Sequence, residues 1–201
     1  MKQLLILAMI TGTANADLVM SREFSFIVSV PAKYQKIELK NALGPIATFS
    51  SVDQENGRIY HVIAHRILSY KDIPKRSVDL TKELVLANFT AYYNGGKEQG
   101  LTTTNVEKKW ADGFAWPVLQ YSFERQGYLE NNKPLYFAGV GLLIDDTFYR
   151  LTVQSESKNG LEAAVTKFFG TFSIANEADI TILEQAGDEP PTTRPKPKRT
   201  P

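Results

Sequence analysis

Apolar and polar residues alternate in three stretches of the first third of the chain, and this period-two pattern is typical of β-strands. The stretches are Phe24 to Val30, Ile46 to Val52 and Arg58 to Leu68. Pro31 ends the first stretch, the Asn56-Gly57 turn signal precedes the third, and Pro74 follows it. The pattern therefore predicts an N-terminal region of short strands.

Two later segments repeat apolar residues every three or four positions, which predicts amphipathic helices. The first helix is expected to start at Ser77 as N-cap, with Asp79 in its first turn, and to end at Gly95-Gly96. The second is expected from about Gly160 to Phe169, with extended structure returning at Thr171 to Ile174.

Strand patterns fill the space between the two helices. The predicted strands are Thr102 to Lys109, Phe114 to Arg125, Leu135 to Ile144 and Phe148 to Gln154. The turn Asp145-Asp146-Thr147 predicts a hairpin, and Pro117 indicates an edge position or a bulge. In the last strand, Tyr149, Leu151 and Val153 should share one face, and Phe148, Arg150 and Thr152 the other. This order predicts an α+β fold, in which helices pack on one largely antiparallel β-sheet.

The N-terminal segment MKQLLILAMITGTANA has the features of a cleavable signal peptide. A positive start at Lys2 leads into the apolar run Leu4 to Ile10, which is too short to span a bilayer, and then into Ala14-Asn15-Ala16. We therefore expect a signal peptide over residues 1–16, one α+β domain over 17–175, and a C-terminal extension over 176–201.

The amino-acid composition favours a bacterial periplasm as the location of the mature protein. The chain has 201 residues, 43% of them hydrophobic, and no cysteine. A domain of this size can form a core without disulfides, on which small exported domains usually depend. Cleavage would remove Lys2 and no acid, and so leave 22 basic and 22 acidic side chains. This balance gives no strong field for nucleic acid, and no later stretch is apolar enough to predict a transmembrane helix.

Two sets of residues are candidates for binding a partner. Trp110, Trp116 and Tyr121 could form an aromatic platform, although such residues also build the core and edge of a sheet. After a possible short helix at Glu177 to Gln185, the Pro-rich tail DEPPTTRPKPKRTP carries four basic side chains that could contact a partner groove, peptidoglycan or anionic lipid, or could simply be solvated. These side chains are Arg194, Lys196, Lys198 and Arg199.

The residues give little reason to predict catalysis or metal binding. His61 and His65 are the two histidines, and Val62 stands where an HExxH motif needs glutamate. On the predicted strand they share a face but lie about 13 Å apart, too far to bind one ion together. The Asp145-Asp146 pair is better explained by its turn. We therefore predict no catalytic, cofactor-binding or metal-ligating residue, and no cofactor.

The second half of the chain resembles the Mog1/PsbP-like proteins, which include the bacterial DcrB-like exported proteins. The resemblance rests on Leu135 to Gly141, Phe148 to Gln154 and Leu161 through Phe172, and on the opening Phe24 to Pro31. It implies an α/β/α sandwich around an antiparallel sheet, and a role in binding or assembly. It assigns no functional residue.

Together these features predict a periplasmic accessory protein without enzymatic activity that acts by protein binding or by assembly of an envelope complex. The alternative is a carrier of a small ligand, or a hydrolase, with a pocket between sheet and helices.

Overall fold

The computed structural model describes residues 16–70, 77–98, 100–127, 133–176, 178–181 and 183. The elements are β1 (Asp17–Ser21), β2 (Phe26–Val30), β3 (Tyr34–Asn41), β4 (Gly44–Asp53), β5 (Arg58–Arg66), η1 (Leu68–Tyr70), α1 (Val78–Glu98), β6 (Thr102–Ala111), β7 (Val118–Gln126), β8 (Leu135–Ile144), β9 (Thr147–Ser155), α2 (Leu161–Gly170) and β10 (Ser173–Ile174).

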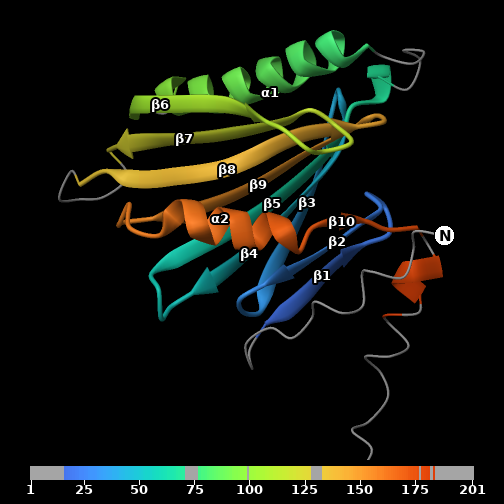
Figure 1. The fold of residues 1–201 in the computed structure, drawn as a ribbon, viewed down its shortest axis with the longest axis horizontal. Coiled ribbons are helices and arrows are strands. Elements are labelled where there is room, and N and C mark those ends of the chain that lie inside the picture. Colours follow the sequence, from blue (N-terminus) through green and yellow to red (C-terminus); the bar gives the residue numbers. More distant parts are fainter. Residues whose placement is uncertain are drawn as a thin grey trace, which may run out of the picture.

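The strands form two antiparallel sheets. The large sheet has seven strands in the order β3-β4-β5-β9-β8-β7-β6, and the small sheet has three in the order β1-β2-β10. Helix α1 packs on β6, β7 and β8, whereas α2 and the small sheet pack on the opposite face of the large sheet (Figure 1). We refer to these faces as the α1 face and the α2 face. The predicted α+β class, with helices packed on antiparallel strands, is confirmed.

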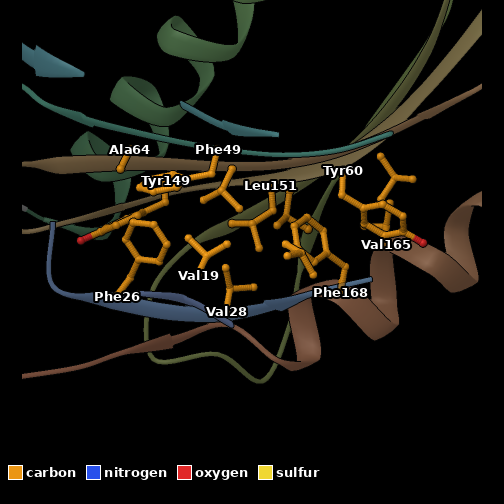
Figure 2. Packing of buried hydrophobic residues seen from close by; sticks show 14 of the residues in the cluster. Val19, Phe26, Val28, Phe49, Tyr60, Ala64, Tyr149, Leu151, Val165 and Phe168 are labelled. Atoms are coloured by element: carbon orange, nitrogen blue, oxygen red, sulfur yellow. The ribbon is translucent and has the colours of Figure 1, made fainter. Parts of the chain in front are cut away.

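The larger core lies on the α2 face, between the large sheet, β2 and α2 (Figure 2). Phe26 of the small sheet meets Phe49 and Tyr149 edge-on, with ring centroids 5.6 and 6.0 Å apart. The Tyr149 hydroxyl donates a 2.6 Å hydrogen bond to the backbone oxygen of Phe24, and burial raises the pKa of Tyr149 to about 12. This contact fixes the small sheet on the large one.

The second core lies under α1 and is mainly aromatic. Phe123 stacks on Phe137 with centroids 4.9 Å apart, and Phe89 of α1 lies 4.8 Å from the ring of Tyr121. The Tyr121 and Thr152 hydroxyls are 2.6 Å apart, so the buried tyrosine has a hydrogen-bond partner on β9. Burial raises the pKa of Tyr121 far above its usual range, so its hydroxyl keeps its proton.

Several local predictions agree with the structure. The hairpin of β8 and β9 turns at Asp145, whose φ is 50°, and its two strands start and end within a residue of the expected limits. Tyr149, Leu151 and Val153 belong to the α2-face core, and Phe148 to the core under α1, as the alternation predicts. The Ser77 hydroxyl accepts a 3.1 Å hydrogen bond from the Leu80 backbone, as an N-cap does.

Other local predictions are wrong. Gly95 and Gly96 lie inside α1, because a glycine costs only about 1 kcal/mol in a helix and packing of the helix outweighs that cost. Phe114 to Pro117 forms a connection, and β7 begins only at Val118, so Pro117 marks neither an edge strand nor a bulge. Strands β1 and β3 were not predicted, and the strands form two sheets where one was expected.

Both ends of the chain contain predicted segments that lie outside the described residues. These are the signal peptide up to Asn15 and the basic tail with Arg194, Lys196, Lys198 and Arg199. Within the possible helix at 177–185, residues 178–181 and 183 are helical, and Ile180 is buried with Ile27 and Ala175. In the described part of the chain, none of the helices has both the length and the apolar character that crossing a membrane requires.

Candidate functional site: the open face of the large sheet

Half of the α1 face of the large sheet extends beyond α1 and is accessible to solvent. We define the open face as the α1-side residues within the ranges 35–39, 46–52, 59–65 and 150–154, from β3, β4, β5 and β9. Three aliphatic side chains at its margins are strongly exposed: Ile37 at 55%, Leu39 at 61% and Val52 at 50%. Clustered exposed apolar side chains indicate a binding surface, whereas isolated ones are ordinary.

The strand register arranges the open face in rows that cross the strands. The middle row pairs Ile37 with Thr48, Thr48 with Ile63, and Ile63 with Arg150. Since neighbouring strands lie about 4.8 Å apart, this row spans roughly 14 Å from β3 to β9. His61 and His65 belong to the rows on either side of it, so each lies diagonally across from Arg150.

His61 is held between two neighbouring strands. Its Nδ1 lies 2.9 Å from the Ser50 hydroxyl on β4, and its ring also forms a hydrogen bond with the Gln154 side chain on β9. Burial lowers the pKa of His61, and the nearby Arg150 charge lowers it further. Burial and Arg150 likewise lower the pKa of His65. Both imidazoles are therefore neutral at pH 7.

Arg150 is the single charged side chain on the open face. Its guanidinium carbon lies 3.4 Å from the ring centroid of Tyr92, so the side chain is stacked against α1. Within the described part of the chain, neither Arg150 Nε nor His65 Nε2 has a hydrogen-bond partner, although both atoms are shielded from solvent. The open face thus holds two unpaired polar nitrogens where it meets α1.

The two edges of the large sheet differ. Strand β3 pairs with β4 over eight consecutive residue pairs without interruption, and every residue of β3 after Tyr34 is exposed. Strand β6, at the other edge, has a register shift between Thr104 and Glu107, and Asn105 there has φ 50°. A bulge of this kind hinders pairing with a further strand, whereas a long regular edge favours it.

A concave site lies on the α2 face, between α2 and the strands β6, β7 and β8. It has a volume of about 370 Å³ and polar walls that include Glu107, Lys109, Gln120 and Glu162. Neither histidine is among its lining residues, since both lie on the opposite face of the sheet. This groove has the location expected for a pocket between sheet and helix, but it lacks the imidazole that the hydrolase alternative needs.

The structure does not bring the predicted aromatic platform together. Tyr121 is 4% exposed and lies in the core under α1, so its ring is not accessible to a partner. Trp110 is half-buried on the α1 face, with the Lys82 ammonium 5.5 Å from its ring centroid. Trp116 is 42% exposed in the connection before β7, near Phe114, whose ring lies 5.3 Å from that of Phe169. A binding role for these residues stays a prediction.

No metal site emerges from the described residues, among which no three histidine, aspartate or glutamate side chains could hold an ion together. His61 and His65 occupy one strand and one face, as predicted from their spacing.

Sequence reasoning missed the other members of the open face. Arg150 and Ser50 lie more than ten residues from their histidine neighbours along the chain, and the strand register brings them together. The signal that could have indicated β3 was Ile37 and Leu39 alternating with Lys36 and Glu38.

Comparisons with known proteins give structural likeness at low sequence identity. The solution structure of cyanobacterial PsbP (CyanoP) from Synechocystis sp. PCC 6803 is 14% identical, with a TM-score of 0.48, over 82% of this chain and 95% of that chain. The crystal structure of PA94, a protein of unknown function from Pseudomonas aeruginosa, is 14% identical, with a TM-score of 0.32, over 92% of this chain and 99% of that chain. No family model and no curated protein matches the sequence.

One of these neighbours carries the PsbP name that the sequence resemblance put forward, and neither carries the DcrB-like name. The α+β class rests on the strands and helices of the chain itself.

Proposed function

We propose that this chain is a periplasmic accessory protein without enzymatic activity, and that it binds an extended segment of another envelope protein along β3. The observation that carries the proposal is the β3 edge, which is regular, exposed and bears Ile37 and Leu39 on one face. Its outward backbone N–H and C=O groups can pair with an added strand.

The chemistry of β3 defines the kind of segment that fits it. Alternate side chains of an added strand would extend the apolar surface of Ile37 and Leu39 on the α1 face. On the α2 face the strand would meet Lys36 and Glu38, which form an ion pair with each other. A partner strand with apolar residues on one side and both charge signs on the other therefore matches this edge.

The charges around His61 argue against the hydrolase alternative. Ser50 and His61 have the spacing of a nucleophile and its base. In a catalytic triad, however, a carboxylate stabilises the imidazolium, whereas here the third side chain is Gln154 and the nearby charge is the cation Arg150. Both burial and Arg150 oppose protonation of His61, so the pair is poorly suited to general-base catalysis.

The periplasmic location is a proposal based on the N-terminal segment. The first strand starts at Asp17, directly after the proposed cleavage site, so cleavage there would leave β1 complete. Cell fractionation and N-terminal sequencing test this location: we expect a periplasmic chain starting at Asp17. An uncleaved chain in the cytoplasm would overturn the proposed location.

Site-specific photocrosslinking in living cells tests the binding proposal. A photoreactive residue at Ile37 should capture one envelope protein, whereas the same residue at Lys108, on the bulged edge β6, should not. Excess wild-type protein should suppress the capture, and so should a competitor with Lys108→Ala. A competitor with Leu39→Lys should not.

Equal capture at both edges, or none at Ile37, would contradict the proposal. A covalent dimer of this chain would also contradict it, because the occupant of β3 would then be a second copy.

A further inference from the structure

We propose that the open face also binds a small monocarboxylate with an apolar tail, with the carboxylate against Arg150 and the tail along the row to Ile37. The evidence is the Arg150 guanidinium at one end of this row, which has no counter-charge among the described residues, and the exposed aliphatic side chain of Ile37 at the other end. This inference does not depend on β3 binding a protein.

The positive charge at this site has no counter-charge in the described part of the chain. The ion pairs there join Lys36 to Glu38 and Arg66 to Asp146, and neither involves Arg150. A second guanidinium, Arg125, lies 5.0 Å from the ring centroid of Tyr92 and donates hydrogen bonds to backbone oxygens of α1. Arg125 is buried and bonded to α1, so Arg150 is the guanidinium at the boundary of the open face.

The orientation of Arg150 suits it for a carboxylate. Stacking on Tyr92 restrains the guanidinium plane, which limits the conformational entropy lost when a ligand binds. The guanidinium of Arg150 is also a planar fork of N–H donors, a geometry that a carboxylate matches. His65, diagonally across from Arg150 on the neighbouring strand, lies close enough for its ring to report on a ligand bound there, although its Nε2 is itself shielded from solvent.

The row next to Arg150 suits an apolar tail. It passes over Ile63 and Thr48 to Ile37, a distance of roughly 14 Å at the usual strand spacing. At the inner end of the row, Arg150 of β9 lies opposite Gly141 of β8 in the strand register. A Cβ atom added at Gly141 would lie 3.3 Å from the Phe148 side chain and 3.9 Å from the Val85 side chain. The row is therefore closed by α1 and the core at the Arg150 end and accessible at the β3 end.

The site favours a single negative charge. Among the described residues that define the open face, Arg150 is the one with a formal charge, since burial and Arg150 lower the pKa values of both neighbouring histidines. A monocarboxylate balances this charge, whereas a dianion would leave one charge poorly solvated.

Titration of the purified mature protein with decanoate tests the proposal. Decanol and decylamine are the matched probes, since they keep the ten-carbon chain and replace the carboxylate by a neutral or a positively charged head. We expect saturable decanoate binding, with shifts of the Arg150 Nε–H and His65 ring signals in the NMR spectrum, and markedly weaker binding of the other two probes. Equal binding of decanol, or decanoate binding without these shifts, would overturn the proposal.

Substitutions locate the two ends of the ligand. Arg150→Gln should weaken decanoate binding at least about tenfold, because it removes a charge-assisted hydrogen bond. Arg58→Gln, on β5 but on the other face, should leave binding unchanged. Ile37→Ser should weaken the binding of decanoate but not that of butanoate, whose shorter tail does not reach β3.

If Arg150→Gln fails to fold, the decanoate affinity of Arg150→Lys and the ligand-induced NMR shifts in the wild-type protein test the proposal. Arg150→Lys should keep part of the affinity, because it keeps the charge and loses the planar fork. Unchanged affinity in a folded Arg150→Gln variant, or a loss of equal size in Arg58→Gln, would overturn the proposal.

Discussion

The half of the large sheet under α1 and the half beyond it use the same antiparallel pairing but differ in what lies on their α1 face. Under α1, Phe89 of the helix packs against Tyr121 and Phe123, and Phe123 stacks on Phe137. Beyond α1, Ile37 and Leu39 project into solvent from an unpaired edge. Apolar side chains on the α1 face therefore stabilise the fold where α1 covers the sheet, and they stay accessible to solvent where it does not.

The largest expected effect distinguishes the two halves directly. Phe123→Ala should lower the free energy of unfolding by about 3–5 kcal/mol, since it leaves a cavity among the stacked rings. Leu39→Ala, at a 61% exposed position of β3, should change it by less than about 0.5 kcal/mol. Urea unfolding of both variants measures the difference. Losses of similar size would show that the β3 half also contributes packing to stability.

A pair of glycine substitutions tests whether the half of the sheet beyond α1 is also less tightly packed. Gly44→Ala should destabilise by about 2 kcal/mol or more, because the new Cβ would lie 2.0 Å from the backbone oxygen of Arg66. Gly95→Ala, inside α1 with open space around it, should stabilise by up to about 1 kcal/mol. Thermal unfolding measures both shifts. A tolerated Gly44→Ala would mean that the contact between the start of β4 and the end of β5 adjusts easily.

The N-cap of α1 offers a smaller perturbation of the covered half. Ser77→Ala should cost about 1 kcal/mol, because it removes the acceptor of the Leu80 N–H. Thr90→Ala, which removes an exposed hydroxyl bonded to a helix carbonyl, is the control and should change stability little. Urea unfolding and amide exchange in the first turn of α1 measure the loss. No difference between the two variants would count against the cap.

The smallest expected effect is a pH dependence that arises in the exposed half. The folded-state pKa values of His61 and His65 are lowered from 6.5, so the unfolded chain binds more protons as the pH falls through this value. Stability should therefore decrease from pH 7.5 to pH 5.5, and less so in a His61→Gln, His65→Gln double variant. Urea unfolding at both pH values measures this difference. An equal decrease in both proteins would contradict the lowered pKa values.

The predictability of the fold followed the strength of local signals. The β8–β9 hairpin was predicted to within a residue because the alternation is long and the Asp145-Asp146 turn is short. Strand β3 was missed because an exposed edge strand carries charged residues on the face that a buried strand would fill with apolar ones. Gly95-Gly96 was misread as a helix end because local propensity is weak against tertiary packing.

The candidate site was less predictable than the fold. The two histidines were assigned to one face of a strand, which the spacing alone determines. Ser50, Gln154 and Arg150 could not be associated with them, since cross-strand neighbours depend on register and not on distance along the chain. Trp116 and Tyr121 are only five residues apart, yet Trp116 lies in an exposed connection and Tyr121 lies in the core under α1.

By itself the sequence determined the α+β class, the hairpin, both helices and the expectation of export, because each depends on a local pattern of apolar, turn or capping residues. Tertiary structure alone decided which apolar side chains are buried. Helix α1 covers β6, β7 and β8 and leaves the α1 face of β3 exposed and that of β4 and β5 partly exposed, since a single helix is narrower than a seven-stranded sheet. The position of that one helix leaves Arg150 at the boundary between core and solvent.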